Sequence, residues 1–138
     1  MSDTQIKFEL VSPEEKLVSD SYRMVVVPGD EGIIGVLPGH SSLVTSLKAG
    51  VVKMYKTNDD KDPARVFIAG GFADITPELC TVLAEGAVNV NKLNKADLDK
   101  TLADLNEDLN LAKEEADKKR IEQKIAIVKA KIQAVSDA

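Results

Sequence analysis

The sequence contains no tryptophan, one cysteine and one histidine among 138 residues. A single cysteine excludes a disulfide framework and a cysteine-based metal cluster, and a single histidine excludes a histidine-rich metal site. No apolar run approaches the roughly 20 residues of a membrane-spanning helix. The formal net charge of −5 lacks the basic excess with which nucleic-acid-binding proteins neutralise phosphates. The composition therefore argues against a nucleic-acid partner and against a membrane anchor.

Glycine and proline are missing from the last third of the chain. All eight glycines and all five prolines lie at or before Gly86, and all five Phe and Tyr residues lie at or before Phe72. From Ala87 onward the sequence is mostly Ala, Leu, Ile, Lys, Asp and Glu. Such a shift in composition predicts two domains, residues 1–90 and residues 91–138.

The first domain is expected to be β. Short runs rich in β-branched residues are bounded by Gly, Pro, Asp or Asn, and the turn signals recur at the intervals of a sandwich or barrel. "KTNDDKDPAR" is predicted to be a hairpin loop, and the lone Cys80 is expected to be a small buried residue. The expected strands are "IKFELV", "YRMVVV", "GIIGV", "SLVTSL", "GVVKMYK", "ARVFIAG" and "ELCTVLA".

The second domain is expected to be helical. It carries two apolar stripes with helical spacing, and the second is out of phase with the first, which favours an antiparallel hairpin with a turn around Glu114–Lys118. Two i, i+4 ion pairs in that turn leave one long bent helix as an alternative. The stripes are Leu98, Leu102, Leu105, Leu109, Ala112 and Ala116, then Ile121, Ile125, Val128, Ile132 and Val135.

No set of residues predicts catalysis. "GDEGIIG" matches neither glycine-rich phosphate motif, and it runs into a Pro-Gly pair instead of a helix. His40 is the only candidate general base, but no nucleophile or second histidine accompanies it. Asp30 and Glu31 are adjacent and unconvincing as paired catalytic carboxylates. We therefore expect no catalytic, cofactor or metal site, which leaves an interaction module.

Two blocks of the sequence resemble a known family. "PGDEGIIGVLPGHSSLVTSLKAG" strongly resembles a loop-strand-loop of the epsilon subunit of F-type ATP synthase, and "VFIAGGFADITPELCTVLAE" resembles the family's second block. "FELVSPEEKLVSD" fits its first hairpin. The resemblance covers the whole chain and implies a mainly β plus α fold, a flattened antiparallel β-sandwich followed by an antiparallel two-helix hairpin. The positions in register in the first block are Gly32, Gly35, Pro38, Gly39, His40, Leu43, Leu47 and Gly50.

The resemblance implies a non-catalytic subunit of the rotating central stalk, which couples proton flow to ATP synthesis. Its partners would be the gamma subunit and the membrane ring of c subunits, with two loops at the ring-facing end of the sandwich. Position 33 is often acidic in the family and is Ile33 here, so that polar contact is not expected. The interface residues implied are Gly29, Asp30, Glu31, Gly32, Pro38, Gly39, His40, Ser41 and Ser42.

The resemblance also concerns the helical hairpin, which in the family packs on the sandwich or extends toward the alpha/beta catalytic head and inhibits ATP hydrolysis. Some relatives bind ATP at the start of the first helix, where this chain reads "LNKADL". Leu93 fits the motif, but Asn94 replaces an Asp, Asp97 an Arg and Leu98 an Ala. An anion therefore stands where a cation would contact phosphate, and we expect weak or no ATP binding.

Three functional hypotheses follow: a rotor subunit, a regulator that inhibits through the hairpin, and a ligand-binding β-sandwich adaptor with an unrelated helical tail. The scarcity of aromatic residues counts against the adaptor. "MSDTQIKF" lacks the basic and apolar regions of a signal peptide. We expect a peripheral protein at the cytoplasmic face of a bacterial inner membrane, held there by the ATP synthase complex.

Overall fold

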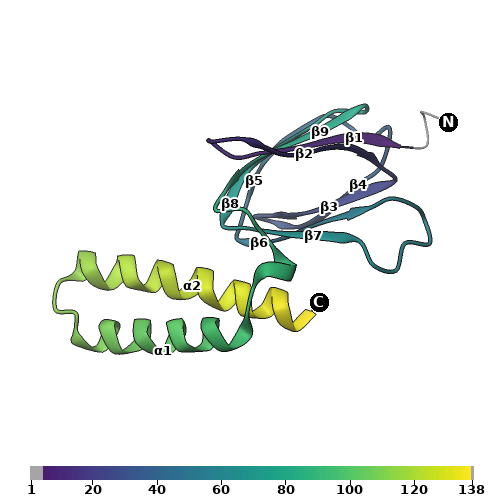
Figure 1. Cartoon of the computed structure of the whole chain (residues 1–138). Coiled ribbons are helices and arrows are strands. Elements are labelled where there is room, and N and C mark those ends of the chain that lie inside the picture. The colour runs from purple at the N-terminus through teal and green to yellow at the C-terminus, as the bar shows by residue number, and fades with distance from the viewer. Residues whose placement is uncertain (1–4, 138) are drawn as a thin grey trace. The chain divides into compact units, whose positions relative to one another are not determined.

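The structure is a computed structural model that describes residues 5–137. The chain divides into two compact units, the first ending at Asn89 and the second beginning at Val90 (Figure 1). The sequence predicts this division one residue later, after position 90. The first unit is built of strands and the second of helices. The expected fold class, a β-sandwich followed by two helices, is confirmed.

Ten strands make up the described part of the first unit. Most of their inward positions are apolar and alternate with exposed positions, as in β1, where Ile6, Phe8 and Leu10 are buried while Lys7 is exposed. This period of two is what the pleat of a strand requires when only one face is buried. The strands are β1 Ile6–Val11, β2 Lys16–Tyr22, β3 Met24–Gly29, β4 Gly32–Val36, β5 Leu43–Leu47, β6 Gly50–Tyr55, β7 Ala64–Ile68, β8 Gly70–Ile75, β9 Leu79–Glu85 and β10 Val88–Asn89.

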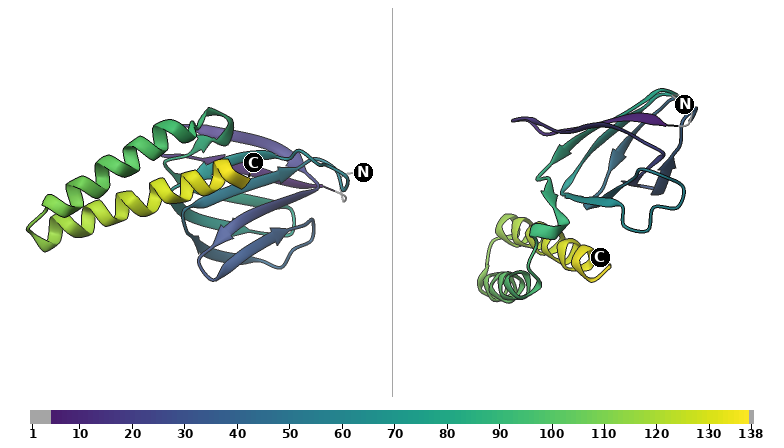
Figure 2. Two further views of the ribbon diagram at one scale, coloured as in Figure 1. Left: turned by 90° about the horizontal axis from the view of Figure 1, so that it is seen from below. Right: turned by 45° about the vertical axis from the view of Figure 1, so that its right-hand side comes forward.

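The strands form one continuous ladder that folds over into two layers, in the order β10-β7-β6-β3-β5-β8-β9-β1-β2, with β4 paired to β3 (Figures 1 and 2). The fold-over lies where β5 leads into β6, because Leu47 lies opposite Gly29 and the Lys48 amide donates to the Pro28 carbonyl. One layer therefore holds β4, β3, β6, β7 and β10, and the other holds β5, β8, β9, β1 and β2. The pairing of β1 with β9 is parallel, whereas the family resemblance implies an antiparallel sandwich.

Three strands and one strand boundary differ from the expected runs. β2, β8 and β10 are not among the strands predicted from apolar runs, because β2 is mostly polar, β8 begins with two glycines and β10 has only two residues. "YRMVVV" is predicted as one strand, but Tyr22 ends β2 and Met24 begins β3. Between them the Arg23 amide donates to the Tyr55 carbonyl, 2.7 Å away, so the backbone passes from one layer to the other at this residue.

The core lies between the two layers. Phe8 and Tyr22 meet edge to face, with ring centroids 6.1 Å apart, and Cys80 is fully buried, as expected. In the described residues no polar or charged side chain is buried. Burial of apolar side chains therefore stabilises this unit without internal ion pairs. The fully buried large side chains of the core between the layers are Phe8, Ile6, Leu10, Met54, Ile68, Ile75, Val25, Val27, Val36, Val52 and Val82.

The second unit is a two-helix hairpin preceded by one short turn of helix, η2 Val90–Lys92. α1 covers Lys95–Leu111 and α2 covers Glu115–Asp137. The helices are separated by residues 112–114, so the turn begins earlier than the predicted Glu114–Lys118. Asn94 caps α1, because its side-chain oxygen accepts a hydrogen bond from the Asp97 amide at 3.2 Å. Neither helix is long and apolar enough to cross a membrane.

We expect the first unit to fold without the helices. A protein shortened by removal of residues 91–138 keeps every strand, Gly and Pro, together with the core between the layers. Thermal unfolding of this fragment should be cooperative, with a near-UV circular dichroism signal from the packed Phe8 and Tyr22 rings. A fragment with far-UV but no near-UV signal would show that the hairpin is needed to order the core.

Candidate interaction surface

The first predicted loop is the tip of the β3–β4 hairpin. Gly29 pairs with Gly32, which leaves Asp30 and Glu31 as a two-residue turn with both side chains exposed. The turn depends on both glycines, because Gly32 has φ +145° and a Cβ on Gly29 would lie 2.6 Å from the Gly32 carbonyl oxygen. The Asp30 amide donates to the Ser46 carbonyl at 3.0 Å. The tip thus holds two adjacent carboxylates in water on a backbone anchored to β5.

The second predicted loop is the corner between β4 and β5. Gly39 has φ +86°, and its amide donates to the Pro77 carbonyl at 2.8 Å. The His40 amide donates to the Leu37 carbonyl at 3.1 Å, and His40 Nδ1 lies 2.6 Å from the carbonyl oxygen of the neighbouring Ser41. His40 therefore makes its contacts within the turn itself. The surface of the corner consists of compact backbone and the exposed hydroxyls of Ser41 and Ser42.

The two loops lie at opposite ends of the strands that join them. β4 leads from the hairpin tip to the corner, and β5 leads back, so that Leu43 lies opposite Ile75 near the corner while Leu47 lies opposite Gly29 near the tip. Five extended residues span roughly 13–17 Å. The expectation that both loops lie at one end of the sandwich is therefore wrong, because "GIIGV" between them is a full strand. Which loop contacts which partner stays a prediction.

An open depression of about 640 Å³ adjoins the corner. Pro38 and Gly39 form one wall, and Lys7 and Glu78 bring charges of opposite sign to it. The remaining lining residues are Gln5, Ser21 and Pro77. Within residues 5–137 no group of three His, Cys, Asp or Glu side chains is placed to hold a metal ion. The depression is open to solvent and offers an accessible surface beside the corner.

The outer face of the β5–β8–β9 layer carries an apolar patch, Val44, Phe72 and Leu83, that the sequence interpretation missed. Val44 is 70% exposed, and Phe72 and Leu83 are each 55% exposed. Phe72 and Leu83 lie directly opposite each other in the β8–β9 ladder. The alternation in β8 could have revealed the patch. Ala73 and Ile75 are buried on one face of the strand, so Phe72 must point to the opposite face. Large apolar side chains gathered on an outer face indicate a surface for a protein partner.

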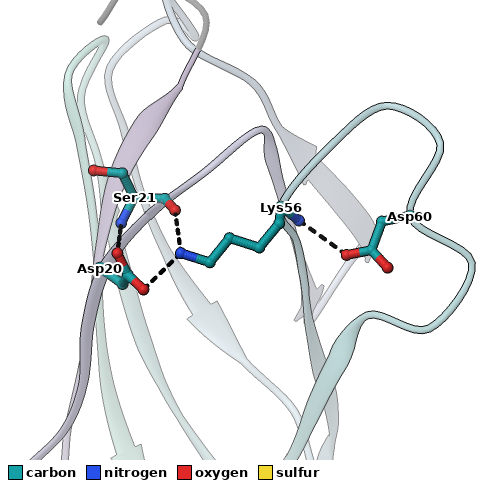
Figure 3. Close-up of polar contacts among 4 residues, drawn as sticks. All are labelled: Asp20, Ser21, Lys56 and Asp60. Carbon is teal, nitrogen blue, oxygen red and sulfur yellow. Dashed lines mark hydrogen bonds and ion pairs between the residues drawn. The ribbon is translucent and has the colours of Figure 1, made fainter.

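The far end of β2 is tied to the loop after β6 by Lys56 (Figure 3). Its ammonium lies 2.6 Å from an Asp20 carboxylate oxygen and 3.1 Å from the Ser21 carbonyl oxygen, and it stands 4.5 Å from the centroid of the Tyr22 ring. The hydrogen bond from Lys56, followed by that from the Ser21 amide, lowers the pKa of Asp20. Burial raises the pKa of Tyr22. These groups join the two layers, and their solvent exposure makes the contribution of the ion pair to stability small.

The lone thiol is chemically inert in the fold. Burial, aided by the Asp74 carboxylate, raises the pKa of Cys80 to about 12, and the side chain has no exposed surface. Because the thiolate is the reactive form, Cys80 will not act as a nucleophile near neutral pH.

The degenerate ATP motif serves as a helix start. Leu93 and Leu98 flank the cap, with Leu98 half-buried, and Asn94 uses its side-chain oxygen to cap the Asp97 amide. Asp97 lies in the first turn of α1, where a carboxylate is stabilised by the helix dipole. These residues therefore have a structural role at the position where relatives were expected to hold nucleotide.

Two family models together match most of the protein. Residues 5–90 match the ATP synthase, Delta/Epsilon chain, beta-sandwich domain, and residues 94–138 match the C-terminal domain of the ATP synthase epsilon chain. The ATP synthase epsilon chain of Rhodospirillum centenum is 40% identical over 135 residues, which cover 96% of this chain and 92% of the relative. That of Brucella suis is 49% identical over 92 residues, 67% of either chain.

Solved structures share the fold. A subunit in the mitochondrial ATP synthase of Euglena gracilis, solved as OSCP/F1/c-ring, has a TM-score of 0.84 at 22% identity, and the match covers 96% of this chain and 82% of that subunit. One in the central stalk/c-ring of the Tetrahymena thermophila enzyme has a TM-score of 0.63 at 12% identity, with coverages of 94% and 96%. The chain therefore belongs to the family of ATP synthase epsilon chains, as its sequence predicted, and is a non-catalytic subunit of that complex.

Proposed function

We propose that this protein is a subunit of the rotating central stalk, bound to the gamma subunit and to the membrane ring of c subunits, through which proton flow is coupled to ATP synthesis. It is then peripheral to the membrane, at the cytoplasmic face of a bacterial inner membrane. The observation that carries the proposal is the exposed apolar patch of Val44, Phe72 and Leu83 on a protein whose relatives are subunits of ATP synthase. The separation of the two loops supports contacts with more than one partner.

Reconstitution tests the proposal. The protein should co-purify with the gamma subunit of its own ATP synthase, and Phe72→Ser with Leu83→Ser should weaken that complex while the isolated protein still unfolds cooperatively. Val44→Thr is a milder change in the same patch, because it keeps the shape of one exposed side chain, and it should weaken the complex less. Failure of the unmodified protein to bind either gamma or the c-ring would contradict a place in the stalk and would favour the ligand-binding adaptor.

Cysteine cross-linking assigns the loops to partners. Glu31→Cys and Ser41→Cys place thiols on exposed residues at the two ends of the sandwich, and the buried native Cys80 should not compete. Cross-links from the two positions to different subunits are expected. Cross-links from both positions to the same c-subunit loop would be incompatible with the separation of the loops.

The hairpin supports a second, regulatory function in which it contacts the alpha/beta catalytic head and restrains ATP hydrolysis. The supporting observation is that no residue of α1 is buried and that Leu111 is 74% exposed, so a long helical surface is available to another molecule. ATP hydrolysis by the reconstituted enzyme should rise when residues 91–138 are removed. Unchanged hydrolysis with normal assembly would leave the stalk function intact and eliminate the regulatory one.

We expect the purified protein to show no saturable ATP binding at millimolar concentration, which corresponds to about 4 kcal/mol or weaker. Asp97 stands where a cation would contact phosphate, and the Asn94 oxygen is engaged by the Asp97 amide. The double change Asn94→Asp with Asp97→Arg should recover at most part of the affinity, since it restores the motif alone. Calorimetric titration measures both proteins, and a clear isotherm for the unmodified one would show that the motif is misassigned.

A further inference from the structure

Strand β4 has one free edge. Among the strands formed by residues 5–137 it pairs with β3 alone, outside the main path of the ladder. Its five residues are extended and in continuous register from Gly32 to Val36, with no bulge. An unpaired edge of this kind presents main-chain donors and acceptors to which another strand can bond.

The register decides which backbone groups of β4 point to the free edge. Pro28 lies opposite Ile33, and the Pro28 carbonyl accepts from the Lys48 amide on the other side of β3. In an antiparallel ladder, a residue whose carbonyl points away from its partner belongs to a non-hydrogen-bonded pair, so both members direct their polar groups outward. Ile33 therefore presents its N–H and C=O to the free edge, and Gly35, two residues further, does the same.

The edge of β4 is unprotected, in contrast to that of β2. On β2 the Ser21 carbonyl accepts a hydrogen bond from Lys56, whose ammonium is also paired with Asp20 (Figure 3). β4, "GIIGV", contains no lysine, proline or bulge, the devices that normally prevent a sheet edge from pairing. No side chain of the described residues bonds to its outward backbone groups.

The side chains around this edge select a type of strand. Ile33 is 76% exposed, and Gly35 leaves the backbone beside it uncovered, so an incoming segment can approach closely. Asp30 and Glu31 place two exposed carboxylates at the start of β4. A matching segment therefore has an apolar residue beside Ile33 and a lysine or arginine within reach of the hairpin tip.

We propose that the free edge of β4 binds an extended segment of another ATP synthase subunit, which adds a strand to the sheet through the backbone of Ile33 and Gly35 and pairs a basic side chain with Asp30 or Glu31. This mode of recognition obtains affinity from main-chain hydrogen bonds and specificity from alternate side chains. The proposal rests on the proposed function, because it requires that the protein be assembled with the other subunits.

Amide hydrogen exchange provides the first test. In the isolated protein, Ile33 and Gly35 should exchange at least about tenfold faster than Ile34 and Val36, whose amides bond to β3. In the complex with the other F1 subunits and the c-ring, exchange at Ile33 and Gly35 should slow at least about tenfold. Unchanged exchange at both amides in an otherwise assembled complex would overturn the proposal.

A pair of variants at one residue provides the second test. Gly35→Pro removes an amide that the sheet does not use, whereas Gly35→Ala keeps it and places a Cβ no closer than 3.8 Å to the Met24 sulfur. Gly35→Pro should bind the complex about tenfold or more weakly than Gly35→Ala, at similar thermal stability. Equal binding by the two variants would contradict strand addition.

Two further outcomes are informative. If the unmodified protein does not join the complex at all, the proposed stalk function is wrong. If it joins normally and Gly35→Pro and Gly35→Ala bind equally well, only the proposed strand addition is wrong. If the isolated protein dimerises with concentration and Gly35→Pro abolishes the dimer, a second copy occupies the edge and the proposal is wrong. Should Gly35→Pro not fold, the exchange measurement on the unmodified protein still decides.

Discussion

Gly71→Ala is expected to lower the free energy of unfolding by about 4 kcal/mol or more, a large part of the about 5–15 kcal/mol that stabilises a typical domain. Gly71 lies inside β8, between Leu47 of β5 and Ala84 of β9. Its φ is +147°, and a Cβ would overlap the Leu83 carbonyl oxygen and lie 3.1 Å from the Ala84 Cα. Both obstacles are backbone held in a ladder, so neither can move without separating β8 from β9.

The neighbouring Gly70→Ala is the matched control. Gly70 has φ +139°, but a Cβ there would meet the Leu47 carbonyl oxygen at an ordinary 3.5 Å. The free energy of unfolding of this variant should fall by only about 1–3 kcal/mol, the cost of placing a non-glycine residue at this φ. Denaturant unfolding of the two proteins measures the difference, which reports the overlap with β9. Equal losses would show that β8 and β9 can separate slightly at little cost.

The division of the fold could be predicted from local patterns. Alternation of apolar residues predicts strands such as β1 and β6, and the leucine stripe predicts α1, because one buried face imposes the period of the element. The apolar-run criterion missed β2 because it is an edge strand in which Tyr22 alone is buried. The parallel pairing of β1 with β9 joins segments about 70 residues apart, and no local pattern encodes such a contact.

The interaction surface was less predictable than the fold. The resemblance identifies the two loops, and the glycines explain their tight turns, but their placement at opposite ends follows from treating "GIIGV" as a strand of full length. Phe72 and Leu83 look like core residues in an apolar run, and only the phase of the pleat shows that they face outward. The exposure of a side chain on a sheet depends on what packs over its face, and no local pattern in the sequence encodes that packing.

Gly39→Val is expected to weaken assembly with the c-ring and gamma subunit at least about tenfold while leaving an isolated protein that still folds. The φ of +86° at Gly39 is unfavourable for a β-branched residue and should cost about 1–3 kcal/mol. No atom lies within 4 Å of an added Cβ, so the core is unaffected. The change instead distorts the corner, where the Gly39 amide donates a hydrogen bond to the Pro77 carbonyl.

The control for this variant must lose at least as much stability and lie outside both loops. Gly86→Val meets the condition, since Gly86 directly follows β9 with φ +58° and an added Cβ would lie 3.1 Å from the Ala69 Cβ, a close contact that Gly39 does not have. It should lose at least comparable stability yet assemble normally. Binding to the complex and thermal unfolding are measured for Gly39→Val and Gly86→Val. Pro38→Ala, a milder change at the same corner, is measured in the same way. If Gly86→Val fails to assemble to the same degree, the defect reflects general instability; if Gly39→Val assembles and supports proton-coupled ATP synthesis normally, the corner is not a contact surface.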